Sequence, residues 1–227
     1  NSTPFGYWTR YNGTPLYDAA TKTTAVKPAD AQKYLELFKD YRNNGLVPPA
    51  DIAAGYAETN ADTSMVIAGK AAIGFIWTNQ LAGYQAATTD ELCLMEFPGA
   101  AATKALWQAP SQFYTVNKNS KYPEAAVKFI NFLVNSPEAA KVLGNDRGAS
   151  ASATARAAGA ADINDRKVLE YLDVAGPHSS KETDHVPNDT EFNSTLFLIY
   201  QKVAFGQIST AAGGQQIYDL IVRLIKK

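Results

Sequence analysis

The sequence predicts an α/β fold in which a short mixed sheet is flanked by many helices and the C-terminal part is helical. Two short apolar runs bounded by polar or turn-forming residues, Ala71–Trp77 and Leu92–Phe97, have the length of buried strands. From Tyr34 onward, apolar residues recur at i, i+3, i+4 and i+7, which is the spacing of an amphipathic helix. Strands separated by helices and followed by a helical tail are typical of α/β proteins.

The predicted helices have recognisable start and stop residues. Proline suits the first turn of a helix, where its missing N–H leaves no bond unmade, so Pro28, Pro123 and Pro137 mark helix starts. Ser136 is a typical capping residue for the last of these helices, and Gly144 is a typical stop. The predicted helices cover residues 28–44, 62–68, 79–86, 137–144, 165–174, 190–205 and 209–226, with one more from 123 onward.

Other segments are predicted to be strands, turns or loops. The aromatic opening, Phe5–Thr24, is predicted to form extended pieces around a tight turn at Asn12–Pro15. Gln112–Asn117 alternates enough to predict a strand. Gly148–Ala161 is rich in alanine and serine and fits either a loosely packed helix or a loop, and Gly176–Asp189 is a polar connector.

The composition argues against several kinds of partner. The 227 residues carry 21 Lys and Arg against 22 Asp and Glu, so the formal net charge is -1. Such balanced and scattered charge gives no reason to expect a nucleic acid or an anionic membrane as partner. No stretch approaches the roughly 20 apolar residues of a membrane span, and Asn1–Pro4 lacks the pattern of a signal peptide.

The reactive residues form no pattern typical of metal binding or catalysis. The single cysteine, Cys93, has apolar neighbours, which predicts a buried and inert thiol. The spacing of His178 and His185 matches no zinc signature, and both are expected in a solvated loop. Gly69-Lys70 lacks the preceding glycine and the following Ser or Thr of a phosphate loop. We therefore expect no metal, no cofactor and no catalytic residues.

Aromatic residues accompanied by polar ones form candidate binding clusters. Trp77 ends a predicted strand and precedes Thr78 and Asn79, and ligands of α/β sheets bind at the carboxyl ends of strands. An indole face suits the apolar side of a sugar ring, whose hydroxyl groups need directional hydrogen-bond partners. A Trp77 packed inside the core is the equally weighted alternative.

Two further clusters, Tyr7–Tyr11 and Trp107–Phe113, repeat this combination of aromatic and polar residues. Their candidate ligand-contacting residues are Tyr7, Trp8, Trp107, Gln108, Ser111 and Gln112. Arg147 follows a predicted helix end and is a candidate contact for an anionic or hydroxylated ligand; an ordinary surface arginine is the alternative.

Several short segments carry a resemblance to one protein family, and they occur in that family's order. Tyr34–Pro49 is similar to a helix that ends in a Gly-Leu-Val-Pro turn, and Met65–Trp77 is similar to a Gly-Lys-Ala-Ala-Met segment. Tyr114–Ala139 is the most similar stretch, Asp146–Gly148 resembles an Arg-Gly-x-Pro turn, and Gly206–Ala212 resembles the start of the last helix. Together these segments resemble the extracellular solute-binding proteins of bacterial ABC importers, in their sugar-binding branch.

The resemblance implies a two-lobed fold of the type II periplasmic-binding class, in a protein considerably longer than 227 residues. The matched segments are those of the family's latter half, so we expect a fragment. Residues 1–110 would form the first part of the ligand-binding C-terminal lobe. Residues 111–161 would be a crossover that completes the N-terminal lobe, and residues 162–227 would return to the C-terminal lobe as helices.

The resemblance also implies a function, the capture of a sugar by hinge closure and its delivery to a membrane permease. The ligand-facing positions of the family are matched by Trp77, Asn79, the loop Trp107–Gln112 and Arg147, whereas Tyr7 and Trp8 rest on chemistry alone. An extracellular location is implied, either as a cell-surface lipoprotein or in the periplasm, and no enzymatic activity is implied.

Two other classes of function stay open at this point. A glycoside-active enzyme with an aromatic cleft would need two carboxylates facing each other across the site. A carbohydrate-binding module would present its aromatic residues as an exposed flat strip.

Overall fold

The computed structural model of the chain describes residues 3–56, 60–181 and 185–226. The helices are α1 (Thr3–Tyr11), α2 (Pro28–Asn43), α3 (Ala50–Ala54), η1 (Ala61–Thr63), η2 (Thr78–Gln80), α4 (Leu81–Ala86), α5 (Ala100–Thr103), α6 (Pro123–Asn135), α7 (Pro137–Leu143), α8 (Ala153–Gly159), α9 (Ile163–Ala175), η3 (Gly176–His178), α10 (Asp189–Ala204) and α11 (Thr210–Ile225). The strands are β1 (Leu106–Gln108) and β2 (Ser179–Lys181).

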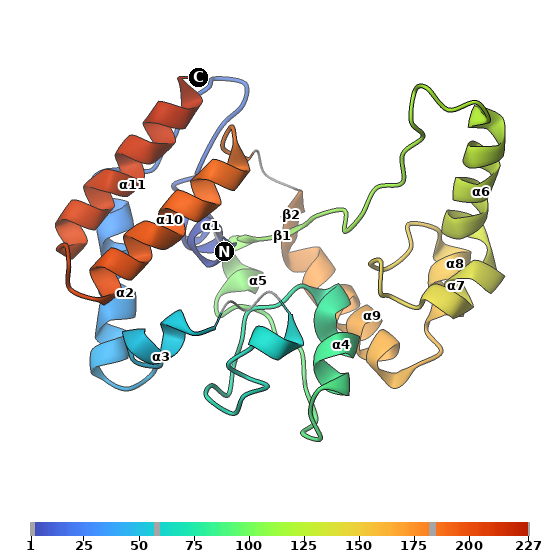
Figure 1. Cartoon of the computed structure of the whole chain (residues 1–227), viewed down its shortest axis with the longest axis horizontal. Coiled ribbons are helices and arrows are strands. Elements are labelled where there is room, and N and C mark those ends of the chain that lie inside the picture. The colour runs from blue at the N-terminus through green and yellow to red at the C-terminus, as the bar shows by residue number, and fades with distance from the viewer. Residues whose placement is uncertain (1–2, 57–59, 182–184, 227) are drawn as a thin grey trace.

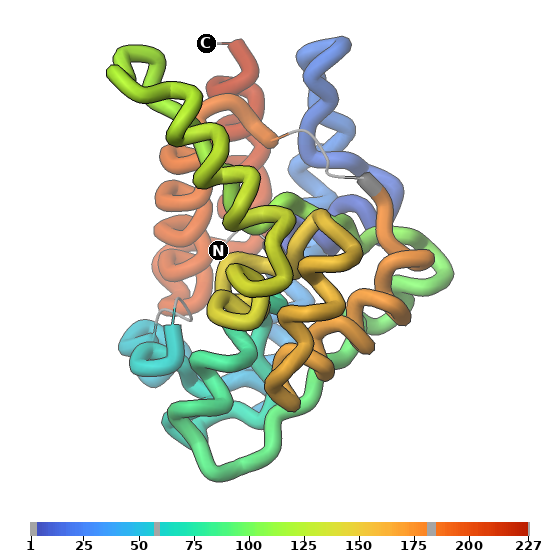
Figure 2. Tube along the Cα trace, turned by 90° about the vertical axis from the view of Figure 1, so that its right-hand side faces the viewer, coloured from blue at the N-terminus to red at the C-terminus, as the bar shows by residue number. Residues whose placement is uncertain are grey.

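These elements gather in groups along the long axis of the molecule (Figure 1). The layer formed by α2, α10 and α11 lies on the left, and α4, α5 and α9 lie with the two strands in the middle. The helices α6, α7 and α8 form a separate group on the right, and the turned view places this group in front (Figure 2). The chain passes from the left group to the right and back, so both of its ends build the left layer.

The main hydrophobic core lies in this left layer. Its fully buried large side chains are Phe5, Val26, Val186, Phe192, Leu196, Ile217, Ile221 and Leu224. Tyr34 of α2 packs in the middle of the layer, with its ring 5.1 Å from that of Phe5 and 4.9 Å from that of Phe38. Because burial of one such side chain contributes roughly 1.5–3 kcal/mol, this layer supplies much of the packing free energy of the chain.

Helix α11 packs closely along α2 because two glycines leave side chains out of the contact. A Cβ on Gly214 would lie 2.6 Å from the carbonyl oxygen of Pro28 and 2.8 Å from the backbone nitrogen of Gln32. A Cβ on Gly213 would lie 2.8 Å from Cδ1 of Leu35. The two glycines therefore let the helix backbones approach, and this packing offsets their low helix propensity.

Most of the predicted helices are confirmed, and their ends agree with the capping signals. The Ser136 hydroxyl accepts hydrogen bonds from the backbone N–H groups of Glu138 at 3.1 Å and Ala139 at 3.4 Å, as a helix cap should. Gly144 has a positive φ and ends α7. The stretch 148–161, for which the sequence fits either a helix or a loop, contains α8. The predicted helix 62–68 is replaced by the short η1 and turns.

The opening segment is helical, so the prediction of extended pieces there was wrong. Helix α1 has Pro4 in its first turn, and a turn at Asn12-Gly13 follows it, with φ +70° at Gly13. Aromatic residues have modest helix propensity, and tertiary packing overrides it here: Phe5 of α1 is fully buried in the main core.

The α/β class is confirmed, but the sheet is smaller than predicted. The strands β1 and β2 pair in parallel, with Leu106 opposite Ser179 and Gln108 opposite Lys181. These two strands make up the sheet in the described part of the chain, so it is parallel and not mixed.

The predicted strands at residues 71–77 and 92–97 are extended segments that form no strand pair in the described part of the chain. They lie side by side, since the rings of Phe75 and Phe97 stack with centroids 5.1 Å apart and planes at 12°. An apolar alternating run becomes a strand only where its backbone finds a hydrogen-bonding partner strand. Here the two segments are in contact through side chains, and the described residues form no ladder of backbone hydrogen bonds between them.

Cys93 is exposed, which contradicts the prediction of a buried thiol. The segment 92–97 is extended, so alternate side chains point to opposite sides, and Cys93 and Met95 share the outer side. Apolar sequence neighbours therefore did not imply burial for this thiol.

The predicted strand at residues 112–117 is a connection that runs from β1 to α6 (Figure 1). Helix α6 beyond it contains no buried residue, and Phe129 on this helix is 60% exposed. In the described part of the chain, no helix is long and apolar enough to cross a membrane.

Candidate functional site

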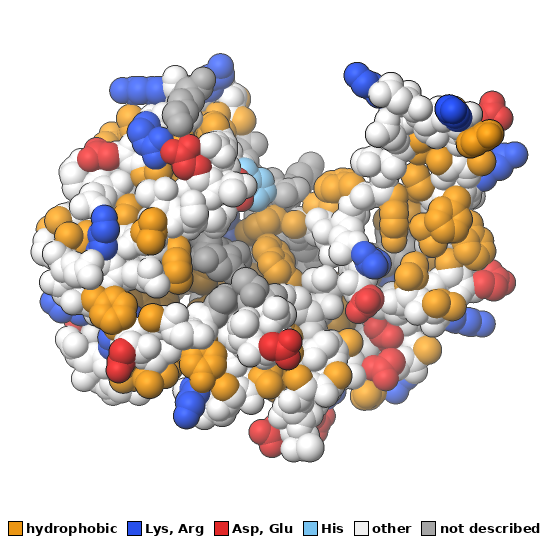
Figure 3. Space-filling view, in the orientation of Figure 1, with side chains coloured by type: hydrophobic (Ala, Val, Ile, Leu, Met, Phe, Trp, Pro, Cys, Tyr) orange, Lys and Arg blue, Asp and Glu red, His pale blue; other side chains and the backbone are white. Residues whose placement is uncertain are grey.

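A pocket of about 650 Å³ lies where α1 and the middle group of elements, which includes α9, face α8 and the loop before it. Its walls come from α1, the segment before η2, β1 with the loop after it, the loop before α8, and α8 and α9 themselves. The surface is hollowed in this region, between the left layer and the right-hand group, with hydrophobic side chains at the base (Figure 3). Segments far apart in the sequence therefore share one site.

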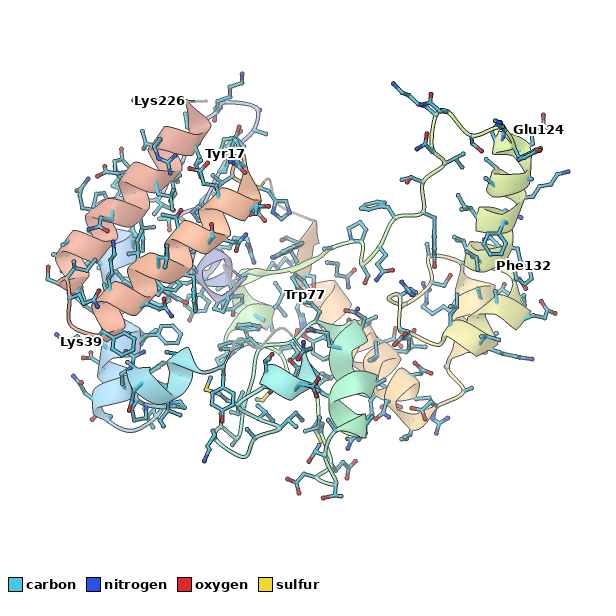
Figure 4. The ribbon with its side chains drawn as sticks, in the orientation of Figure 1. Tyr17, Lys39, Trp77, Glu124, Phe132 and Lys226 are labelled. Carbon is cyan, nitrogen blue, oxygen red and sulfur yellow. The ribbon has the colours of Figure 1, made fainter. Side chains whose placement is uncertain are left out.

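Two of the predicted aromatic residues, Trp77 and Trp107, meet in this pocket. Their ring centroids lie 5.7 Å apart and their planes are at 76°. Trp107 also contacts His185, with ring centroids 5.8 Å apart, and the guanidinium of Arg10, 5.7 Å from its ring centroid. Trp77 is 44% exposed and lies in the middle of the molecule (Figure 4), so the alternative that it is packed in the core was wrong.

The polar residues after Trp107 divide between the pocket and its surroundings. Gln108 and Ser111 line the pocket. Gln112 and Arg147 do not line it; they contact each other, and Arg147 Nη1 donates to Gln112 Oε1 at 3.3 Å. Gly148 lines the pocket beside Ser111, and a Cβ on Gly148 would lie 2.4 Å from that of Ser111. Only glycine allows this approach of the two segments.

Trp8 and Asn79 also lie outside the pocket lining. Trp8 packs against the main core, with its ring 6.0 Å from that of Tyr34. Asn79 Nδ2 lies 3.5 Å from the carbonyl oxygen of Asp146, a long contact at the margin of the site. Consecutive residues of a helix point about 100° apart, so Tyr7 of α1 faces the pocket whereas Trp8 faces α2.

Helix α1 supplies two pocket side chains, Tyr7 and Arg10, three residues apart on one helix face. The Tyr7 hydroxyl donates to the carbonyl oxygen of Pro98 at 2.8 Å, and burial raises the pKa of this phenol. Arg10 Nε donates to the carbonyl oxygen of Ala105 at 2.6 Å. Arg10 lies in the predicted cluster Tyr7–Tyr11. Only the prediction of a helix there would have placed Arg10 on the same face as Tyr7.

Sequence reasoning missed the far wall of the pocket, which α8, α9 and the loop before α8 form. Its residues include Ser150, Ala153, Arg156, Ala157, Leu169, Tyr171, Leu172 and Asp173. No local signal marks them, because a helix face that lines a site has the same spacing as a face that packs on a core. Burial raises the pKa of Tyr171, the aromatic residue of this wall.

Among the described residues, few carboxylates lie in or near the pocket. Asp173 is the carboxylate residue of the described lining. Glu96 lies close enough to raise the pKa of Tyr7, but both of its oxygens are 3.2 Å from Nδ1 of His178. His178 lies in η3 and is partly buried, whereas a solvated loop was predicted. The described residues hold no group of His, Cys, Asp or Glu side chains that fits a metal ion.

The fold is similar to that of solved solute-binding proteins. An extracellular solute-binding protein of family 1 from Alicyclobacillus acidocaldarius matches 99% of this chain with 26% identity and a TM-score of 0.81. A periplasmic oligogalacturonide-binding protein from Yersinia enterocolitica, solved with saturated digalacturonic acid, matches 97% of the chain, also with 26% identity and a TM-score of 0.81. These likenesses confirm the predicted type II binding-protein fold.

A de novo designed cysteine esterase shares the fold as well, with 27% identity over 97% of this chain and a TM-score of 0.73. The chain spans 56–58% of the length of these three proteins.

The family model of bacterial extracellular solute-binding proteins matches residues 2–169, which is most of the chain. The sequence resemblance, the fold and the pocket point in the same direction. The chain belongs to the bacterial extracellular solute-binding protein family.

Proposed function

We propose that this chain carries a sugar-binding surface of a solute-binding protein that serves an ABC importer. The observation that carries the proposal is the pocket in which Trp77 and Trp107 stand edge to face beside Gln108 and Ser111. The family of the chain supports it, and so does the fold shared with an oligogalacturonide-binding protein.

The chemistry of the pocket suits a saccharide. Indole rings offer faces to the apolar side of a sugar ring, and rings of this kind make a large contact at low entropic cost. The amide of Gln108 and the hydroxyl of Ser111 both donate and accept hydrogen bonds, as sugar hydroxyl groups require. A volume of about 650 Å³ lies within the usual range of small-molecule sites.

The two alternative functions have less support. Glycoside hydrolysis needs a pair of carboxylates across the site, whereas the described lining offers Asp173, and Glu96 is engaged by His178. A module that adheres to a polymer needs a flat aromatic strip, whereas the rings of Trp77 and Trp107 are at 76° in a hollow. We therefore propose binding without turnover.

We further infer that residues 111–161 belong to a second lobe, which residues 1–110 and 162–227 oppose. The exposed apolar face of α6, with Phe129 60% exposed, supports a partner segment there, since soluble proteins rarely leave such a face uncovered. The greater length of the matched structures supports it too. A structure of the chain extended to that length tests this inference: Phe129 left in solvent would contradict it.

The extracellular family supports a function outside the cytoplasm, and we propose that the protein works in the periplasm or as a lipid-anchored protein at the cell surface. Its second partner would be the membrane permease of the importer. Closure of the lobes around the sugar would create the surface that the permease recognises, because a ligand held by both lobes favours the closed state.

Isothermal titration calorimetry with a panel of oligosaccharides, peptides and polyamines tests the proposal. We expect a heat of binding with at least one oligosaccharide and none with the peptides or polyamines. Chromatography of the incubated sugar should recover it intact. Binding of a peptide or polyamine in place of any sugar would overturn the sugar assignment, and cleavage of the sugar would overturn the proposed lack of turnover.

A further inference from the structure

Arg10 is held against the pocket in a way that leaves the end of its guanidinium uncommitted. Its Nε donates to the carbonyl oxygen of Ala105 at 2.6 Å, which ties the side chain to the backbone just before β1. The guanidinium lies near the ring of Trp107, 5.7 Å from the ring centroid. Gly6, one helical turn earlier, leaves room for it, since a Cβ there would lie 3.3 Å from Nη1. Arg10 lines the pocket from this fixed position.

The charge of Arg10 is not matched by a carboxylate in the described part of the chain. The ion pairs found there join other residues, Lys167 to Glu91 and Arg223 to Glu191, and the two histidines lie against Glu96 and Asp189. Burial lowers the pKa of Arg10 to about 10, so the group is still a cation at neutral pH. A partly desolvated cation without a counter-charge costs free energy, and a bound anion would offset that cost.

The charges around Arg10 also favour an anionic ligand. The described lining contains two arginines, Arg10 and Arg156, against one carboxylate, Asp173. Arg156 Nη1 already donates to the carbonyl oxygen of Ser150 at 2.8 Å. Glu96 is a described carboxylate near the pocket, and His178 engages both of its oxygens. Among the described residues, the hydrogen bond of Arg10 uses Nε, so its two terminal nitrogens together have no hydrogen-bond partner there, whereas one terminal nitrogen of Arg156 is engaged.

We propose that the bound sugar is acidic and that Arg10 receives its carboxylate, as in a uronic acid residue. A guanidinium presents parallel N–H groups that match a carboxylate in a two-bond contact, and with Nε engaged the Nη pair is the matching edge. The sugar ring would then lie close to Trp107, whose indole the guanidinium already contacts. This inference rests on the proposed function and adds the class of sugar to it.

The test compares two disaccharides of the same linkage that differ at C6, digalacturonate with its carboxylates and the neutral galactose disaccharide with hydroxymethyl groups. Binding to the 227-residue chain is followed by tryptophan fluorescence, because Trp77 and Trp107 line the pocket, and by calorimetry. We expect digalacturonate to bind about tenfold to a hundredfold more tightly, as a charge-assisted hydrogen bond allows, and the preference to weaken as salt is added.

Arg10→Gln should remove this preference for the acidic sugar while binding of the neutral one changes little. Arg166→Gln is the matched control, because Arg166 carries the same charge on α9 outside the pocket lining, and the preference should persist in it. Circular dichroism checks that both variants fold. If Arg10→Gln fails to fold, the comparison of the two sugars on the unchanged chain still decides whether the acidic sugar is preferred.

The outcomes separate the two proposals. Equal affinity for the two disaccharides, or a preference that survives in a folded Arg10→Gln, would overturn the role of Arg10 and leave the sugar-binding function standing. Binding of neither disaccharide, together with a hit for a peptide or polyamine, would overturn the sugar-binding function and this inference with it.

Discussion

The indole of Trp77 meets the indole of Trp107 in a T-shaped contact, with ring centroids 5.7 Å apart and planes at 76°. The two residues come from segments distant in the sequence, one just before η2 and the other in β1. Edge-to-face pairs of this kind contribute about 0.5–1.5 kcal/mol beyond their buried area. The contact therefore fixes the positions of the two indole rings in the pocket before a ligand binds.

Replacement of Trp77 should weaken sugar binding much more than it weakens folding. The side chain is 44% exposed, so Trp77→Ala removes little core packing, but it removes an aromatic face from the pocket. We expect the affinity for the best oligosaccharide to fall by about tenfold or more, in line with the loss of one aromatic contact. Calorimetry on the variant measures it.

Trp8→Phe is the control for this experiment. Trp8 packs on the main core outside the pocket lining, so its replacement should lower the thermal midpoint and leave the affinity unchanged. An affinity that falls in Trp8→Phe and persists in Trp77→Ala would show that the pocket is not the sugar site.

The contact of α11 with α2 predicts opposite effects for two glycine-to-alanine changes. Alanine improves helix propensity by about 1 kcal/mol, and Gly83 of α4 has open space where a Cβ would be added. Gly83→Ala should therefore stabilise the chain by up to about 1 kcal/mol. At Gly214 the Cβ would lie 2.6 Å from the carbonyl oxygen of Pro28, so the helices must separate.

We expect Gly214→Ala to destabilise the chain by about 1–3 kcal/mol, because the cost of overpacking exceeds the gain in propensity. Urea unfolding followed by circular dichroism measures both variants. A Gly214→Ala variant as stable as Gly83→Ala would mean that α11 and α2 lie further apart than the structure shows.

The approach of Gly148 to Ser111 predicts a coupled pair of mutations. Gly148 has φ +87°, and a Cβ there would lie 2.4 Å from Ser111 Cβ and 2.9 Å from Ser111 Oγ. Gly69 has φ +66° with open space around it, so Gly69→Ala should cost only backbone strain, about 1–2 kcal/mol. Gly148→Ala should cost more, because the side-chain clash is added.

Removal of the Ser111 side chain should relieve that added cost. We expect Ser111→Gly to recover part of the stability lost in Gly148→Ala, as a double-mutant cycle in urea measures. Simple additivity of the two changes would contradict the contact between the loop after β1 and the loop before α8.

The pair formed by Lys167 and Glu91 predicts a change in acid titration. Lys167 Nζ donates to Glu91 Oε1 at 2.8 Å, and this hydrogen bond holds the pKa of Glu91 below its ordinary value. Because the pKa of Glu91 is lower in the folded chain than in the unfolded one, the pair stabilises the fold fully when the pH is above the unfolded pKa. This stabilisation is lost as the pH falls through the folded pKa, below about pH 4.3.

Lys167→Met should therefore raise the pKa of Glu91 toward its ordinary value and reduce the share of stability lost in that acid range. Carbon-detected NMR titration of the Glu91 carboxyl measures its pKa, and unfolding midpoints at neutral and acid pH measure the stability lost in acid. Lys128→Met is the control, since Lys128 has no ion pair in the described part of the chain. A Glu91 pKa that does not move in Lys167→Met would contradict the pairing.

Local signals were sufficient for most helices. Proline at the starts of α2, α6 and α7, the Ser136 cap and the stop at Gly144 act within one turn of the chain, so they can be recognised without knowledge of the partners. The apolar stripe from Tyr34 is confirmed in part, because Tyr34 is buried and Phe38 packs on the main core, whereas Tyr41 is exposed and the unpredicted Leu35 is buried. The Gly213-Gly214 pair is visible in the sequence. The reason for it, the close approach of α2, is not visible there.

The strands and the first helix were misjudged for a non-local reason. Residues 71–77 and 92–97 have strand-like sequences, but a strand also needs a partner, and the described chain offers none beside them. The aromatic and turn-rich composition of residues 5–11 favours extended structure, whereas the core into which Phe5 packs makes them helical.

By itself, the sequence determined the helical framework, the α/β class and a resemblance strong enough to indicate the family. It also pointed to Trp77, Trp107, Gln108 and Ser111, because aromatic and polar residues at segment ends suggest a ligand. Tertiary structure alone decided which candidates share a pocket, and it added Arg10 and the wall from α8 and α9. A binding site is a relation among segments distant in the chain, and the packing of the helices, which no local pattern records, brings those segments together.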